Sequence, residues 1–353
     1  MPKRWTQRPE GSTWGDWGDD DELGRINLLT PERVLAGARE VQAGVSFCLS
    51  LPLDFPGGTA LNQRRHPPVL NPTEDMAGTP SVFYNVRMSE MPDFGDPKYV
   101  DVWADDVVTL ALQYSTQWDS LAHVGAEFDA DGDGIEEAVY YNGYRAGVDL
   151  VGPADDARGD GSGHRCFAHH LGLEHMAAHG VQGRGVLVDL AHHLGLDWRG
   201  VDLATLQDVM AADDVVVEPG DMLLLHTGFA TKVLEWDRNP DPRELFTTAA
   251  YLDAKDDALL QWIADSQISA LVADNYAVEA MLGGGPLVDG KRTLLPIHQL
   301  CLFKLGVPLG EMWYLHELAT WLREHDRSRF LLTAPPLRLP GIVGSPLTPV
   351  ATV

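Results

Sequence analysis

Short apolar runs alternate with amphipathic stretches along the chain, most clearly between residues 180 and 310. Apolar runs bounded by turn residues predict buried strands, whereas apolar positions three and four residues apart predict helices. The runs that predict strands are 183–191, 222–229 and 268–275, and the stretches that predict helices are 169–180, 202–211, 252–266 and 296–306. Because strands and helices alternate here, we expect an α/β or α+β domain.

The rest of the chain shows no repeat and no break in composition, so we expect a single domain over residues 1–353. A polar N-terminal segment with several tryptophans, at about 1–25, is expected to wrap a surface or a partner subunit. The stretch 51–97 is rich in Pro, Gly, Asn and Met and is too long for a plain connector, which indicates a functional segment or one that packs over a site. The proline-rich stretch 334–353 predicts an extended tail or an edge strand.

Composition narrows the choice of partners. The 353 residues are 44% hydrophobic and 22% charged, which is ordinary for a globular protein with a normal core. The formal net charge is -26, so nucleic acid and membrane are poor partners, because both carry negative charge. No run approaches the ~18–20 apolar residues of a membrane span. Three widely separated cysteines favour a reducing compartment, and we expect a cytoplasmic protein.

The stretch "STQWDSLAH" at 115–123 gathers the side chains with the most chemical potential. The apolar run 107–116 predicts a buried strand that continues to Asp119. Alternate residues of a strand share a face, so Gln113, Ser115, Gln117 and Asp119 would point the same way. Buried polar groups need partners. Either a pocket or metal ion supplies them, or this is a strand end that bonds to neighbouring loops.

Other features have simpler interpretations. The turn Asp129–Gly134 resembles the start of a calcium loop but lacks the glutamate required at its twelfth position, so it predicts an acidic surface turn. The adjacent pairs His169-His170 and His192-His193 predict surface or core residues, although His164 and His169 could line a pocket. The aromatic residues near 115–123 would form either a wall for a planar substrate or part of the core; they are Trp118, Phe128, Tyr140, Tyr141 and Tyr144.

Residues 113–123 read Q-Y-S-T-Q-W-D-S-L-A-H. They resemble the signature H-x-G-T-H-x-D-x-P-x-H of the putative cyclase family, which includes bacterial kynurenine formamidase and isatin hydrolase. Thr116, Asp119 and His123 match the signature, whereas Gln113 and Gln117 replace two of its histidines. Later stretches resemble further blocks in the family's order, so the resemblance covers most of residues 20–350 and is to the longer-chain members.

The resemblance implies a swivelling β/β/α fold of the α/β class, with a β-barrel-like core flanked by helices, and a homodimer or homotetramer. It implies that Asp119, His298 and Glu311 bind a divalent ion such as zinc or manganese, and that His123 is the acid/base residue. Thr116 is expected to hold the ligand strand by hydrogen bonds. In place of imidazole nitrogens, Gln113 and Gln117 would offer only amide oxygens to the metal.

Three states of the metal site follow from these glutamines: a single metal ion, a harder ion that prefers oxygen, or no metal. The single ion is the favoured hypothesis. A bound ion and His123 together predict a hydrolase of a small amide, lactam or lactone. The alternative is a non-hydrolytic protein on the same scaffold, either a biosynthetic cyclase or dehydratase, or a binding protein without metal.

Overall fold

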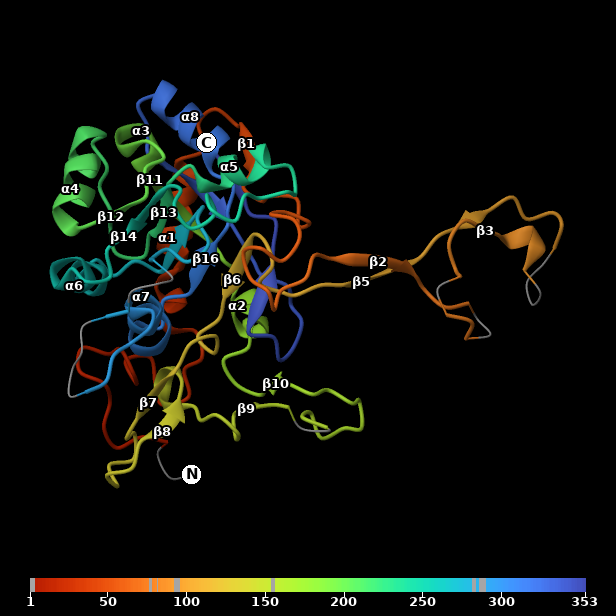
Figure 1. The fold of residues 1–353 in the computed structure, drawn as a ribbon, viewed down its shortest axis with the longest axis horizontal. Coiled ribbons are helices and arrows are strands. Elements are labelled where there is room, and N and C mark those ends of the chain that lie inside the picture. The colour runs from red at the N-terminus through yellow and green to blue at the C-terminus, as the bar shows by residue number, and fades with distance from the viewer. Residues whose placement is uncertain are drawn as a thin grey trace.

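A nine-stranded sheet forms the centre of the molecule (Figure 1). The computed structural model describes residues 4–75, 78–80, 82–91, 96–153, 156–280, 284–285 and 290–353. In spatial order the strands are β1 (Ser46–Cys48), β19 (Val350–Thr352), β17 (Arg329–Thr333), β11 (Gln182–Asp189), β13 (Met222–His226), β15 (Ala270–Ala273), β16 (Leu309–Glu311), β6 (Gln117–Asp119) and β18 (Gly344–Pro346). Strands β11, β13, β15 and β16 are parallel, and the others join antiparallel. The sheet curls into a half-barrel, which confirms the expected α/β fold.

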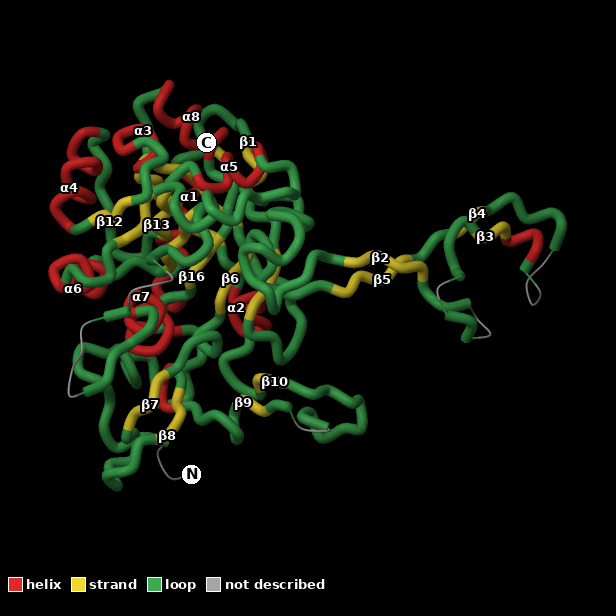
Figure 2. The backbone as a smooth tube through the Cα atoms, in the orientation of Figure 1, coloured by secondary structure: helices red, strands yellow, loops and turns green. Residues whose placement is uncertain are grey.

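Helices cover both faces of this sheet (Figure 2). Along β11, Val186 and Val188 belong to one hydrophobic cluster and Leu187 to the other, as in strands buried on both faces. The helices are α1 (Pro31–Arg39), α2 (Leu173–His179), α3 (Leu190–Leu194), α4 (Leu203–Ala212), α5 (Phe229–Glu235), α6 (Asp257–Asp265), α7 (Pro296–His298), the π-helical turn η4 (Gln299–Leu305) and α8 (His316–Glu324). The strands and helices predicted between residues 169 and 306 are confirmed as β11, β13 and β15 and as α2, α4, α6 and α7 with η4.

The remaining elements lie outside the central sheet. They are the 3-10 turns η1 (Gly24–Leu28), η2 (Met88–Glu90) and η3 (Tyr141–Gly143), and the pairs β2 (Val69–Pro72) with β5 (Asp106–Thr109), β3 (Val86–Arg87) with β4 (Val102–Trp103), β7 (Ala126–Phe128) with β8 (Glu137–Val139), β9 (Leu150–Val151) with β10 (Phe167–Ala168), and β12 (Arg199–Val201) with β14 (Ala250–Leu252). Within the described ranges, no helix has the length and apolar character to cross a membrane.

The predicted buried strand over residues 107–119 is wrong in most of its length. Val107 and Val108 are 49% and 46% exposed and belong to β5, which pairs with β2 in a ribbon that leaves the body. The chain then turns, and only residues 117–119 enter the sheet, as β6. An apolar β-branched run fits an exposed ribbon and a core strand equally well, and periodicity does not distinguish them.

The stretch 51–97 divides into two parts. Residues 51–65 pack beside the sheet, where Leu51 and Phe55 are buried. Beyond them the chain forms the β2–β5 ribbon and the β3–β4 pair, which project away from the body (Figure 1). We call residues 66–110 the arm. The expectation that the whole stretch packs over a site is therefore met only by its first part.

Described stretches near both ends of the chain pack against the body. At the N-terminal end, Trp14 is fully buried, and its ring nitrogen donates to the backbone oxygen of Phe303 over 2.7 Å. The C-terminal stretch supplies β18, an edge strand as expected, but also β19, which lies between β1 and β17. This second strand corrects the prediction. Its residues 350–352 follow the last proline and carry the backbone N–H groups that a central strand needs.

Candidate metal centre

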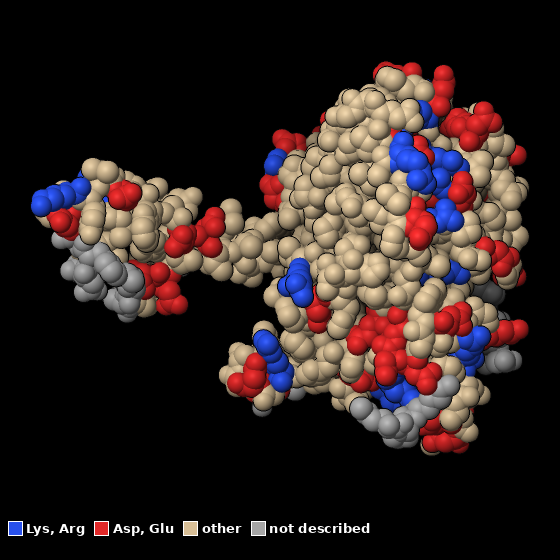
Figure 3. All heavy atoms as spheres, turned by 180° about the vertical axis from the view of Figure 1, so that it is seen from behind, with Lys and Arg blue, Asp and Glu red and all other residues tan. Residues whose placement is uncertain are grey.

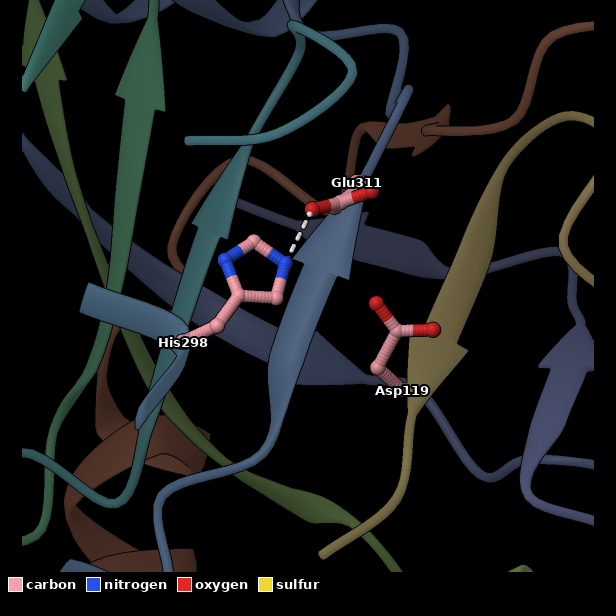
Figure 4. Close-up of side chains that lie close together, drawn as sticks. All are labelled: Asp119, His298 and Glu311. Carbon is pink, nitrogen blue, oxygen red and sulfur yellow. Dashed lines mark ion pairs between the residues drawn. The ribbon is translucent and has the colours of Figure 1, made fainter. Parts of the chain in front are cut away.

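Asp119, Glu311 and His298 converge on one point of the half-barrel (Figure 4). Asp119 ends β6 and Glu311 ends β16, and these antiparallel neighbours pair Gln117 with Glu311. Residues two apart on a strand share a face, so both carboxylates point to the same side of the sheet. His298, from α7, faces them from the adjacent helix. The three side chains that the family resemblance implied as ligands therefore meet, although Asp119 and His298 lie 179 positions apart in the chain.

The chemistry of this group suits a divalent cation. Asp119, His298 and Glu311 are all buried, and each offers one ligand atom within 4.8 Å of the others. Among the described residues, Asp119 Oδ2 is buried without a hydrogen-bond partner, and the contact of Glu311 Oε1 is the ion pair with His298 Nε2, 3.2 Å away. A carboxylate oxygen left without a partner in the interior is costly unless a positive charge lies beside it. The residues present therefore fit a bound metal ion.

The pKa values report the same negative surroundings. Burial raises the pKa of Glu311 to about 7, and the charge of Asp119 adds to this rise. Burial opposes the charged form of His298, but its hydrogen bonds to Glu279 and Glu311 outweigh that effect and raise its pKa to about 10. Both shifts show a site that stabilises a positive charge and disfavours a further negative one.

Glu279 holds the His298 ring in place. Its Oε1 accepts the backbone N–H of His298 over 2.8 Å and lies 2.9 Å from His298 Nδ1, and its Oε2 accepts the N–H of Ile297 over 3.0 Å. These contacts leave His298 Nε2 turned toward Glu311 Oε1, 3.2 Å away. A carboxylate that fixes the second ring nitrogen is a common support of metal-binding histidines. The sequence analysis did not single out Glu279.

His123 lies at the edge of the group, on the turn that follows β6. Its side chain is 22% exposed, and its Nε2 is 3.9 Å from Asp119 Oδ1. Burial is the main cause of its lowered pKa, and the positive charges of His298, Arg65 and Arg64 act in the same direction. A histidine with a lowered pKa is neutral near pH 7 and can accept a proton.

The two glutamines lie in different places. Gln117 is buried, and its Nε2 lies 3.1 Å from Asp119 Oδ1 and 3.2 Å from Glu311 Oε2, so the amide bridges the two carboxylates. Gln113 lies in the turns before β6, not on the strand with Gln117 and Asp119, and its side chain packs against Gly344. Gln117 thus hydrogen-bonds to two of the candidate ligands, and both glutamines line one cavity with His298 and Glu311.

Thr116 anchors the start of β6. Its hydroxyl donates to the backbone oxygen of Met312 over 2.6 Å and accepts the N–H of Leu51 over 2.9 Å. Both contacts are buried and tie the ligand strand to its surroundings. Thr116 thus holds the strand by hydrogen bonds.

A cavity of about 290 Å³ opens beside the three candidate ligands. Its lining includes His123, His298 and Glu311, the apolar side chains Leu61, Tyr276, Leu295 and Met312, and the arginines 64 and 65. The aromatic residues considered from the sequence do not line it. Trp118, for example, is fully buried against Trp313, with ring centroids 5.0 Å apart, and Tyr141 and Tyr144 are buried in the core.

Other polar features of the sequence lie away from this cavity. His164 and His169 pack on Phe167, with ring centroids 5.8 and 5.0 Å from it, and do not line the cavity, which corrects that expectation. In the acidic turn, Asp129 accepts the backbone N–H groups of residues 132–134, and Asp131 pairs with Arg145 over 2.8 Å. These contacts suit an acidic surface turn.

A second titratable group, which the sequence did not reveal, lies at the carboxyl ends of β11, β13 and β15. His226 Nδ1 is 2.7 Å from Asp189 Oδ1, and its Nε2 is 4.0 Å from Asp274 Oδ2. His316 and Arg323 flank this group from α8. Burial would lower the pKa of His226, but the bond to Asp189 and the charge of Asp274 outweigh it, so the pKa is raised.

Comparisons with known proteins agree with this architecture. A family model described as "Putative cyclase" matches residues 49–280. A crystal structure described as a novel cyclase is 31% identical, covers 97% of both chains and has a TM-score of 0.70. Isatin hydrolase A from Ralstonia solanacearum is 15% identical over 91% of this chain and 97% of its own, with a TM-score of 0.54.

A further structure, isatin hydrolase A from Labrenzia aggregata bound to benzyl benzoate, is 13% identical over 91% of this chain and 98% of its own, with a TM-score of 0.52. At these identities the two isatin hydrolases show the shared fold alone. No curated protein matches the sequence. The family match covers more than half of the chain, and the novel cyclase matches nearly all of it. The chain therefore belongs to the putative cyclase family.

Proposed function

We propose that the protein is a metal-dependent hydrolase of a small amide, lactam or lactone. One observation carries this proposal: a buried carboxylate oxygen of Asp119 has no partner among the described residues, and it lies in one group with the carboxylate of Glu311 and with a histidine held by Glu279. That donor set of two carboxylates and one imidazole suits zinc or manganese. The fold shared with isatin hydrolases supports the reaction class.

Different residues of the chain would bind the ion, transfer a proton and exclude water from the substrate. Asp119, His298 and Glu311 would hold the ion, and a bound divalent ion lowers the pKa of water and polarises a carbonyl group. His123, neutral because burial lowers its pKa, takes a proton at its Nε2 and returns it to the leaving group. The apolar side of the cavity, with Leu61, Tyr276 and Leu295, excludes water from the rest of the substrate.

Gln117 supports a second candidate, a protein that binds or rearranges its ligand without metal. Its amide nitrogen donates to both Asp119 and Glu311, as a substitute for a cation would. An amide carries no charge and still leaves Asp119 Oδ2 without a partner among the described residues, so the bridge satisfies only part of the site. The carboxylate oxygen that the amide leaves without a partner favours the metal-dependent hydrolase.

Elemental analysis of protein purified without chelator or nickel resin tests the proposal. We expect about one equivalent of zinc or manganese per chain, and its loss in Asp119→Asn. The control is Asp131→Asn, because the acidic turn holds the other described group of three possible metal ligands, and this substitution should leave the metal content unchanged. No metal above background, even after incubation with each ion, would refute the proposal and favour the metal-free candidate.

Turnover tests the role of His123. On any amide or ester that the metal-loaded protein hydrolyses, His123→Gln should lower kcat by roughly 10²–10⁴-fold, as expected for loss of an acid/base group. His192→Gln is the control, because that imidazole lies on α3, away from the cavity. Full turnover by His123→Gln would exclude it as the proton carrier.

A further inference from the structure

Two arginines stand at the cavity that contains the candidate metal centre. Arg65 is half-buried, and its Nη1 donates to the backbone oxygen of Gln113 over 2.7 Å. Arg64 is exposed beside it, and both side chains line the cavity together with His123. Neither arginine has a carboxylate within ion-pair distance among the described residues, although the chain contains twice as many acidic as basic residues, 52 against 26.

Arg65 lies at the cavity together with the groups that would react. Its side chain and those of His123 and Glu311 line the same cavity. The bond to Gln113 uses one guanidinium nitrogen, so Nε and Nη2 remain as donors for a ligand.

We propose that Arg65, assisted by Arg64, binds a carboxylate of the substrate, so that the enzyme acts on anionic amides, lactams or lactones. The guanidinium fork matches the two oxygens of a carboxylate and forms charge-assisted hydrogen bonds with them. The acidic protein would otherwise repel such a substrate, and the two arginines supply local attraction. The apolar wall of Leu61, Tyr276 and Leu295 would contact the uncharged part. This inference rests on the proposed hydrolase function.

Binding of benzoate, compared with neutral benzamide, tests the arginine independently of turnover. By isothermal titration calorimetry, the wild type should bind benzoate more tightly than benzamide. Arg65→Gln should lower the affinity for benzoate at least about tenfold, as expected for loss of a charge-assisted hydrogen bond, and should leave the affinity for benzamide unchanged. Arg65→Lys should recover part of the affinity because it keeps the charge without the fork. Arg243→Gln, at an exposed arginine that does not line the cavity, is the matched control.

The possible results separate this inference from the proposed function. Three results would overturn the carboxylate site: the wild type does not bind benzoate, it binds benzoate and benzamide equally well, or Arg65→Gln binds benzoate as tightly as the wild type. With 4-acetoxybenzoate and phenyl acetate as substrates, a kcat/KM preference for the charged ester that disappears in Arg65→Gln supports it. Equal turnover of both esters refutes the inference but keeps the hydrolase. Arg65-dependent benzoate binding by a protein that takes up no metal and hydrolyses no amide, lactam, lactone or ester refutes the hydrolase but keeps the site.

The arm carries a second, independent inference. Of the twenty-one large apolar side chains that are exposed in the described part of the chain, ten lie on the arm, among them Leu70 at 70%, Val100 at 90% and Trp103 at 53%. In Figure 3 the stem that joins the arm to the body is largely uncharged. A two-stranded ribbon is at best marginally stable by itself in water. The arm thus has a surface that needs a partner.

We infer that the arm is the surface through which a second copy of the chain binds, in a two-fold contact that forms the homo-oligomer implied by the family resemblance. At side-chain surfaces on the order of 150–200 Å², the ten exposed residues present roughly 900 Å² of apolar surface, divided between the two faces of the arm because neighbouring strand residues point to opposite sides. A second arm that covers both faces would bury an area close to the ~800 Å² that each partner buries in a stable complex. A two-fold contact uses the same surface on both copies, so no other protein is needed to cover it.

Light scattering during size-exclusion chromatography tests this contact. The wild type should be a dimer, or a tetramer built from it, at micromolar concentration. The double substitution Leu70→Glu with Trp103→Glu should yield a smaller species with an unchanged circular dichroism spectrum. Val216→Glu, which places the same charge on an exposed apolar position of the body, should change nothing. A monomeric wild type, or a double variant of unchanged mass, overturns the inference.

Discussion

Glu279→Gln tests whether the carboxylate behind His298 builds the candidate metal centre. Glu279 is 2% exposed and accepts three N–H groups, from Ile297 and from the backbone and ring of His298. Glutamine keeps the shape but has one acceptor oxygen and one NH₂ donor. At least one of the three N–H groups would then face another donor. The His298 ring would lose its fixed orientation or the Ile297 N–H its partner.

The structure sets the expected magnitudes. Removing one member of a buried ion pair costs about 3–5 kcal/mol. An isosteric amide keeps part of the hydrogen bonding, so we expect the lower end, about 3 kcal/mol, in the free energy of unfolding. Loss of the carboxylate that orients a metal-binding histidine lowers metal affinity about 10–100-fold. The two effects come from the same three contacts and should appear together.

Two assays separate stability from metal binding. Urea unfolding of the metal-free protein gives the free energy of unfolding, and competition with a chromogenic chelator gives the affinity for zinc and manganese. Glu317→Gln is the control, because this glutamate on α8 is exposed and the substitution is the same. If Glu279→Gln loses stability but binds metal like the wild type, His298 is not a ligand. If neither quantity changes, the reasoning about Glu279 is refuted.

Two further predictions concern the fold. Gly24→Ala should lower the free energy of unfolding in urea by more than about 1 kcal/mol, because Gly24 has φ +56° and an added Cβ would clash with the backbone of Gly306. Gly134→Ala is the control, because Gly134 also has a positive φ but lies in open space, and equal losses of stability in the two variants would exclude the steric contribution. The raised pKa of His226 stabilises the fold fully below its unfolded value of ~6.5, and this contribution disappears as pH rises through the folded value. The stability difference between wild type and His226→Gln should therefore be larger at pH 6 than at pH 9, and a difference that grows with pH would contradict the pairing with Asp189 and Asp274.

The sequence by itself determined the central elements. Apolar runs between residues 180 and 310 predicted β11, β13 and β15, because strands buried on both faces admit almost no polar residues. The resemblance to the putative cyclase family also implied Asp119, His298 and Glu311 as one group, and the structure brings these three side chains together. Burial leaves a direct mark in the sequence because it restricts which side chains suit a strand, whereas this group followed from the order of the family's motifs.

Only the tertiary structure decided where polar groups meet and which apolar surfaces stay exposed. Glu279 and Arg65 left no signal in the sequence, because a glutamate or arginine is ordinary until the fold sets it beside His298 or at the cavity. The valines of β5 look like core residues in the sequence but lie on the arm. The pattern of apolar residues predicts a strand but does not show which strand it will pair with or whether it will be buried. Long-range contacts are fixed by packing of the whole chain, and local pattern does not contain them.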